Sequence, residues 1–231
     1  MPAWTAGKAP LATRFQLPDL ERDRPANRAD VAILDYGVGN VRSAQKAIEH
    51  GGHSAVITAD PGVLRAAPRL ILPGVGAFGT AIRRLHETGL DEVVKEAARA
   101  GKPVLGICLG MQLLLDSSDE RGAWNGLGIV PGRVVSLAAS APKIPEIGWN
   151  TVEPRDGSPL LRDIPEGMMF YFVHSYICVP NDSAAVGGVT DYGGAFCSVI
   201  AAGNVHAAQF HPEKSGRAGL KFLKNFAELP A

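Results

Sequence analysis

Cys108 lies at the centre of a stretch whose residue types could do nucleophilic chemistry. Residues 106–110 read Gly-Ile-Cys-Leu-Gly, so a glycine lies two residues away from Cys108 on either side. The preceding residues 102–105 predict a short buried strand, and residues 111–115 predict a helix. This spacing is typical of a nucleophile elbow, a strained strand-to-helix turn that pushes the nucleophile out above the strand ends. The alternative is a small core cysteine at the end of a strand.

The start of the predicted helix would also favour a negatively charged sulfur. Backbone N–H groups and the positive end of the helix dipole meet at the first helical turn, and both stabilise a thiolate and a developing oxyanion. The cysteine still needs a base that takes its proton, so the rest of the chain must supply one.

Two of the six histidines are candidates for this base, because the others fall on helix surfaces, in a turn or in an apolar strand. The candidates are His174 and His211. Pro212 and Glu213 follow His211 at the end of a predicted strand, and in an extended segment residues i and i+2 point to the same side. Glu213 is therefore expected to orient the imidazole, which completes the logic of a Cys-His-Glu triad. The alternative is a His-Pro-Glu turn at the surface.

A glycine-rich loop, Pro73-Gly74-Val75-Gly76, follows the predicted strand at 69–72. Two glycines around a valine allow consecutive backbone N–H groups to point at one place, which is what an oxyanion hole requires. The alternative is an ordinary turn at a strand end.

Strand-like and helix-like segments alternate in the first half of the chain. We expect strands at 31–36, 54–57, 69–72 and 102–105, and helices at 41–50, 80–87, 90–100 and about 109–117. This alternation predicts a parallel sheet with helices on both faces. Functional groups in such sheets gather at the carboxyl ends of the strands, where the loops 36–40, 73–78 and 106–110 lie.

The second half of the chain has a different pattern, with short strands between Gly, Pro and Asn turns. We expect strands at 133–137, 150–153, 168–173, 185–190, 195–200 and 205–209, and a terminal helix at 215–227. The sequence therefore predicts an α/β fold, in which a mostly parallel central sheet is covered by helices on both faces and continues into an antiparallel or mixed extension.

Length and composition set further bounds. The chain has 231 residues, and Lys+Arg 23 equals Asp+Glu 23, so no basic field points to nucleic acid. No apolar run approaches the roughly 18 residues of a membrane span. We expect one domain at 30–231. Residues 1–29, which are rich in proline and in charges of both signs, are expected to be a disordered extension.

The three cysteines, at positions 108, 178 and 197, form no Cys-x-x-Cys pair. This spacing argues against a zinc site or a disulfide framework and fits a reducing compartment such as the cytoplasm. The glycine turn at 37–40 lacks the third glycine of a dinucleotide fingerprint, because Arg42 occupies the position at which the pattern requires it. We therefore expect no metal and no cofactor.

Together, these motifs resemble the class I, triad-type glutamine amidotransferases, which have a flavodoxin-like fold. Within them the chain is most similar to the glutaminase subunits of imidazole glycerol phosphate synthase, over about 31–228. The similarity rests on Asp35–Asn40, Pro73–Gly76, Gly106–Gln112, Lys143–Asn150, Tyr171–Tyr176 and Gln209–Lys214.

The resemblance implies a role for each matching residue. Cys108 would attack the side-chain amide of glutamine, His211 would transfer the proton, and Glu213 would orient His211. The resemblance assigns the oxyanion and substrate contacts to Gly74, Val75, Gly76, Leu109, Gln112, Ser175 and Tyr176.

The resemblance also implies a partner, a cyclase subunit with a (β/α)₈ barrel fold that forms a heterodimer with this chain. The cyclase would use the ammonia to make imidazole glycerol phosphate and aminoimidazole carboxamide ribotide in histidine biosynthesis. Asn40, Trp149 and Lys214 match the family's cyclase-facing positions.

One position departs from the family pattern, because Glu146 stands where the family usually has histidine. This residue is outside the triad, so catalysis is expected to survive, but the transfer of interface contacts around 144–149 is weakened. Three other functions remain open at this point: an amidotransferase that feeds pyridoxal phosphate synthesis, a non-catalytic scaffold with the same fold, and a cysteine peptidase or related hydrolase.

Overall fold

A computed structural model describes residues 29–155 and 158–231, so the predicted extension falls almost entirely outside the described residues. The helices are α1 (Val41–His50), α2 (Pro61–Ala66), α3 (Phe78–Thr88), α4 (Leu90–Arg99), α5 (Leu109–Leu113) and α6 (Gly216–Ala227), with 3₁₀ turns η1 (Pro159–Leu161), η2 (Ser183–Ala185) and η3 (Pro212–Lys214). The strands are β1 (Val31–Leu34), β2 (Ala55–Thr58), β3 (Leu70–Gly74), β4 (Val104–Cys108), β5 (Leu115–Ser118), β6 (Trp124–Asn125), β7 (Val130–Ser136), β8 (Glu146–Thr151), β9 (Glu153–Pro154), β10 (Met169–His174), β11 (Tyr176–Pro180), β12 (Val186–Asp191), β13 (Ala195–Ala202) and β14 (Val205–Ala208).

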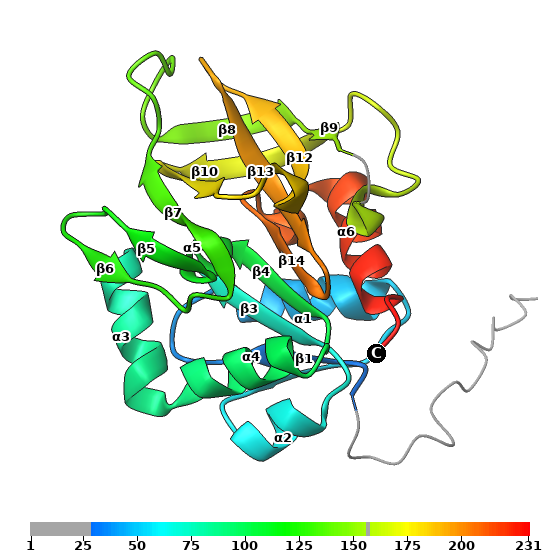
Figure 1. Cartoon of the computed structure of the whole chain (residues 1–231). Helices are drawn as coiled ribbons and strands as arrows, with labels where there is room; N and C mark the ends of the chain where they lie inside the picture. Colours follow the sequence, from blue (N-terminus) through cyan, green and yellow to red (C-terminus); the bar gives the residue numbers. More distant parts are fainter. Residues whose placement is uncertain (1–28, 156–157) are drawn as a thin grey trace, which may run out of the picture.

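One long sheet runs through the molecule (Figure 1). Its main strand order is β2-β1-β3-β4-β14-β13-β11-β7-β5-β6, and β12 and β9 branch from β13. The pairs from β2 to β14 are parallel, whereas β13 pairs antiparallel with β14, β11 and β12. The predicted fold class, a parallel sheet with an antiparallel or mixed extension, is confirmed.

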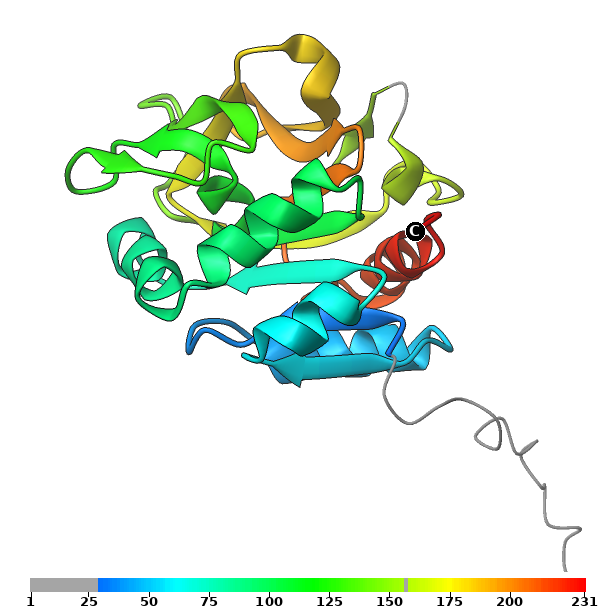
Figure 2. The same cartoon turned by 60° about the horizontal axis from the view of Figure 1, so that its bottom comes forward.

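Both faces of the parallel part are buried, which explains why its strands read as continuous apolar runs. Along β1, Ala32 and Leu34 pack in one hydrophobic core, and Val31 and Ile33 pack in the other. The first core contains side chains of α2, α3 and α4, and the second contains those of α1 and α6. Figure 2 shows these two groups of helices on opposite sides of the strands.

The structure corrects several expected elements. The helix predicted at about 109–117 ends at Leu113, and β5 begins at Leu115 because this segment pairs with β7. The short elements α2, β6 and β11 were not predicted. Strands β8 and β10 pair only with each other and form a separate two-stranded sheet, rather than joining the main sheet as expected.

The strand order brings three loops that are distant in the sequence to one edge of the sheet. Strand β4 lies between β3 and β14, and all three are parallel. Their carboxyl ends therefore place the loop after Leu72, the elbow at Cys108 and the segment after Ala208 side by side.

Candidate active site

The backbone at Cys108 has the strained geometry of an elbow. Cys108 has φ 53° and ψ −110°, a conformation that non-glycine residues rarely adopt. A Cβ atom at Gly106 would lie 2.8 Å from the carbonyl oxygen of Gly110, and one at Gly110 would lie 1.9 Å from the carbonyl oxygen of Leu72. Both glycines are therefore sterically required, because the turn packs directly against the neighbouring backbone.

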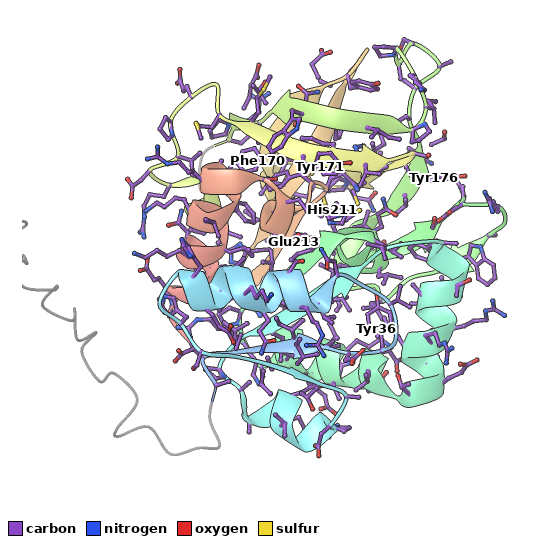
Figure 3. All side chains as sticks on the ribbon, turned by 180° about the vertical axis from the view of Figure 1, so that it is seen from behind. Tyr36, Phe170, Tyr171, Tyr176, His211 and Glu213 are labelled. Atoms are coloured by element: carbon purple, nitrogen blue, oxygen red, sulfur yellow. The ribbon has the colours of Figure 1, made fainter. Side chains whose placement is uncertain are left out.

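His211 and Glu213 make the contact expected of a base and its orienting carboxylate. His211 Nδ1 lies 2.8 Å from Glu213 Oε1, and each side chain is 2% exposed. Figure 3 shows the two side chains together, between α1 and the strand that carries Phe170 and Tyr171. The local backbone differs from the expected extended segment, because η3 begins at Pro212 and the 3₁₀ turn brings the two side chains together. Proline suits the first position of such a turn.

The other ring nitrogen of His211 is available to Cys108. Because Nδ1 contacts Glu213, Nε2 is the ring nitrogen left for Cys108. Burial lowers the pKa of His211, but hydrogen bonds to Cys108 and Glu213 outweigh burial, so the net pKa is raised to about 9. The imidazole therefore holds a second proton near neutral pH and can pair with a thiolate sulfur.

The glycine-rich loop lies directly beside the nucleophile. Gly74 is the register partner of Cys108 in the β3–β4 pair. The hydroxyl of Tyr36 donates a 2.7 Å hydrogen bond to the carbonyl oxygen of Pro73, which anchors the start of the loop. Burial raises the pKa of Tyr36, so this hydroxyl stays protonated as a donor. Gly76 has φ +97°, a conformation that favours glycine.

Tyr36 was not assigned a role from the sequence. It follows β1, and the aromatic residue there could only be connected to the loop once β1 and β3 were known to be neighbours.

A pocket of about 630 Å³ opens above Cys108. The predicted residues that line it are Val75, Gly76, Cys108, Leu109, Gln112, Ser175, Tyr176, His211 and Lys214. Gly74 and Glu213 lie behind this surface, in a small hollow that Asn40 also lines. His174, the other candidate base, also lines the pocket. Sequence reasoning assigned no role to the further lining residues Glu120, Arg121, Ser136, Ile144, Pro145 and Val173. Within the described part of the chain, no three His, Cys, Asp or Glu side chains are grouped as a metal site would need.

The amide nitrogen of Gln112 is held by the protein. It donates to the carbonyl oxygen of Tyr176 and to Gln209 Oε1, each at 3.2 Å. Only the carbonyl oxygen of the Gln112 side chain is therefore left for a substrate amide.

Asn40 occupies the N-cap position of α1, but its side chain makes no capping hydrogen bond. Its Nδ2 instead lies 3.4 Å from Glu213 Oε1. The Asn40 amide therefore contacts the carboxylate of Glu213 instead of capping α1.

Trp149 and Lys214, the other two predicted interface residues, both contact the ring of Tyr171. The rings of Trp149 and Tyr171 meet edge to face with centroids 5.9 Å apart. Lys214 Nζ lies 5.8 Å from the centroid of the Tyr171 ring. Trp149 is 53% exposed, so it is not a core aromatic residue.

Comparison with known proteins places these features in context. Residues 32–229 match the family model described as glutamine amidotransferase class-I. The chain is 48% identical to imidazole glycerol phosphate synthase subunit HisH of Chlorobaculum tepidum, over 86% of this chain and 100% of that protein. It is 51% identical to the subunit of the same name from Moorella thermoacetica, over 86% of this chain and 94% of that protein.

Two solved structures share the fold. A crystal structure of a glutamine amidotransferase has a TM-score of 0.68 at 20% identity, covering 86% of this chain and 99% of the other. The structure of PurLQS from Thermotoga maritima also has a TM-score of 0.68, at 21% identity, covering 86% and 96%.

Proposed function

This chain belongs to the class-I glutamine amidotransferase family, and we propose that it is the glutaminase subunit of an imidazole glycerol phosphate synthase. In this function the chain hydrolyses glutamine to glutamate and ammonia. The ammonia passes to a cyclase subunit in histidine biosynthesis. The single observation that supports the chemistry is the arrangement of Cys108, His211 and Glu213, in which the first two line one pocket and the third orients the base.

The first half of the reaction forms a thioester. The Cys108 sulfur attacks the side-chain carbonyl carbon of glutamine and bonds to it, while the carbonyl oxygen takes up negative charge. His211 Nε2 then donates its proton to the leaving nitrogen, and the C–N bond breaks to release ammonia. Glu213 holds the imidazole through Nδ1, so the same nitrogen faces the sulfur throughout.

The second half of the reaction restores the enzyme. His211 takes a proton from water, the hydroxyl oxygen bonds to the thioester carbon, and the C–S bond breaks to give glutamate. We propose that the backbone N–H groups of the Gly74–Gly76 loop and of Leu109 stabilise the oxyanion in both halves. Removal of one such donor typically costs about 10²–10³ in rate.

The substrate is proposed to lie along the lined pocket. The Gln112 side chain offers its carbonyl oxygen to the substrate amide, and the Ser175–Tyr176 segment meets the end that carries the α-amino and carboxylate groups. Both sets of residues line the pocket above Cys108.

The partner is proposed to be a cyclase subunit with a (β/α)₈ barrel, forming a heterodimer in the cytoplasm. We assign its contact to Asn40, Trp149 and Lys214, and the catalytic domain to residues 30–231. Among the described helices, none is both long and apolar enough to cross a membrane.

The function is tested with Cys108→Ala in the reconstituted complex. Because the variant lacks the nucleophile, glutamine-dependent product formation is expected to fall by at least about 10³-fold. Added ammonium bypasses the glutaminase, so ammonium-dependent product formation is expected to stay within twofold of the unsubstituted complex. Both rates are measured by the appearance of the cyclase product.

Two outcomes count against the proposal. Persistent glutamine turnover in Cys108→Ala would show that another residue is the nucleophile. High glutaminase activity of the free chain, unchanged by the cyclase subunit and its nucleotide ligand, would contradict the role as a subunit of the synthase.

A further inference from the structure

A buried acid–imidazole pair lies beside the pocket and has no part in the triad. Glu146 is 2% exposed and His174 is 6% exposed. Glu146 Oε2 lies 3.1 Å from His174 Nε2, and Asn150 Nδ2 donates to the other carboxylate oxygen, also at 3.1 Å. A buried charge without a partner is costly, so these groups depend on one another.

The carbonyl oxygen next to His174 Nδ1 determines whether this nitrogen carries a proton. His174 Nδ1 is 3.0 Å from the carbonyl oxygen of Tyr176. A backbone carbonyl only accepts hydrogen bonds, so Nδ1 must carry a proton. His174 therefore donates to the Tyr176 carbonyl oxygen.

The Tyr176 carbonyl determines the direction of the next hydrogen bonds. It also accepts from Gln112 Nε2 at 3.2 Å, so the Gln112 side chain must present its NH₂ group there. The same NH₂ group reaches Gln209 Oε1 at 3.2 Å. Because Gln209 presents its oxygen to Gln112, its own NH₂ group must point the other way.

The chain of hydrogen bonds ends at the nucleophile. Gln209 Nε2 lies 3.8 Å from Cys108 Sγ, and Gln209 is 0% exposed, so the amide is closed off from bulk solvent. An N–H donor stabilises a thiolate more than a thiol, whereas an amide oxygen at this place would do the opposite.

We propose that Gln209 is a further catalytic residue, whose amide N–H donates to the Cys108 sulfur. The Tyr176 backbone carbonyl fixes the direction of this N–H through Gln112. The proposal deepens the glutaminase function and rests on it. It goes beyond the triad, because part of the stabilisation of the thiolate comes from a neutral amide. Gln112 and the Tyr176 carbonyl orient this amide.

The test is alkylation of Cys108 by iodoacetamide in the full-length chain, which needs neither glutamine nor the cyclase. Gln209→Met removes the donor at similar volume, and Gln209→Glu replaces it with an acceptor. Both are expected to react about tenfold more slowly at pH 7, because each loses the N–H that stabilises the thiolate. An unchanged rate in both variants overturns the proposal.

Background reaction is measured in Cys108→Ala. The other two cysteines are buried, and burial raises the pKa of the Cys178 thiol well above its usual value and that of Cys197 to about 12, so both are expected to contribute little.

Glutaminase activity in the complex is measured in parallel: if the unsubstituted complex has none, the proposed function fails, whereas the alkylation result still tests the hydrogen-bond chain.

Discussion

At His211, burial and hydrogen bonding act on the imidazole in opposite directions. Burial lowers its pKa, and the contacts with Cys108 and Glu213 raise it to about 9, above the ordinary value of 6.5 for histidine. Because the folded-state pKa is the higher one, His211 contributes to stability fully below pH 6.5, and this contribution is lost as the pH rises through about 9. The same proton is the one that the leaving ammonia needs.

The pH dependence of glutamine turnover therefore tests the protonation of His211. In the complex, kcat/KM for glutamine is expected to fall as the pH rises through about 9. Glu213→Gln keeps an oxygen that accepts from Nδ1 but removes the charge that helps to raise the pKa. Its descending limb is expected to lie at least about one pH unit lower, as measured between pH 6 and 10.

The matched control is Glu166→Gln, which changes an exposed carboxylate away from the pocket and is expected to leave the profile unchanged. If Glu213→Gln keeps the descending limb of the unsubstituted enzyme, Glu213 does not tune the base.

At the scale of elements, the adjacency of β3, β4 and β14 assembles the site. Each strand contributes one loop, and these loops supply the proposed oxyanion groups, the nucleophile and the base. The base has a further support, because α6 packs against η3 at Gly219. A Cβ atom there would lie 1.8 Å from the carbonyl oxygen of Pro212, which is backbone and cannot move aside cheaply.

Gly219→Ala is therefore expected to push α6 and η3 apart. The free energy of unfolding should fall by about 1–3 kcal/mol, the usual cost of overpacking. Glutamine turnover should fall at least about tenfold, because a shift of His211 by a fraction of an ångström misaligns the base. Chemical denaturation and glutaminase assays measure the two effects.

Gly62→Ala in α2 is the matched control for Gly219→Ala. Its Cβ atom would meet only the end of the Asp60 side chain, at 3.0 Å, and alanine is the better helix former. Equal stability and equal activity of the two alanine variants would show that the close approach of α6 does not support the base.

For the whole molecule, the exposed apolar side chains near the pocket mouth form one surface on the β8–β10 sheet. Ile147 is 59% exposed, Trp149 is 53% exposed and Met169 is 51% exposed. An aromatic anchor among apolar neighbours is typical of a protein interface. This surface lies beside the pocket into which ammonia is released, which is where a cyclase subunit that receives it would have to bind.

Trp149→Ala is expected to weaken the complex with the cyclase subunit by at least about 30-fold, which is about 2 kcal/mol. Val63→Ala on α2, which lies at the opposite end of the molecule in Figure 1, removes a 37% exposed side chain and is expected to leave the Kd unchanged. Titration calorimetry measures both. Equal Kd values for the two variants would place the interface elsewhere.

The sequence by itself determined the features that depend on neighbouring residues. The Gly-x-Cys-x-Gly spacing predicted the elbow, and the helix predicted at 41–50 is α1. The alternation of strands and helices predicted the fold class. These inferences succeed because turn sterics and hydrophobic periods are local properties of the chain.

Only the tertiary structure decided the contacts between distant segments. Gln209 and Cys108 are 101 residues apart, and Asn40 and Glu213 are 173 residues apart. No local pattern indicates that β14 lies beside β4, that β8 and β10 leave the main sheet, or that the Asn40 amide reaches a carboxylate instead of capping α1. Strand order and the pairing of buried polar groups depend on how the whole chain packs, because a buried donor takes whichever acceptor the packed fold brings within reach. The identity of the nucleophile could therefore be inferred from the sequence, whereas the orientation of the groups around it could not.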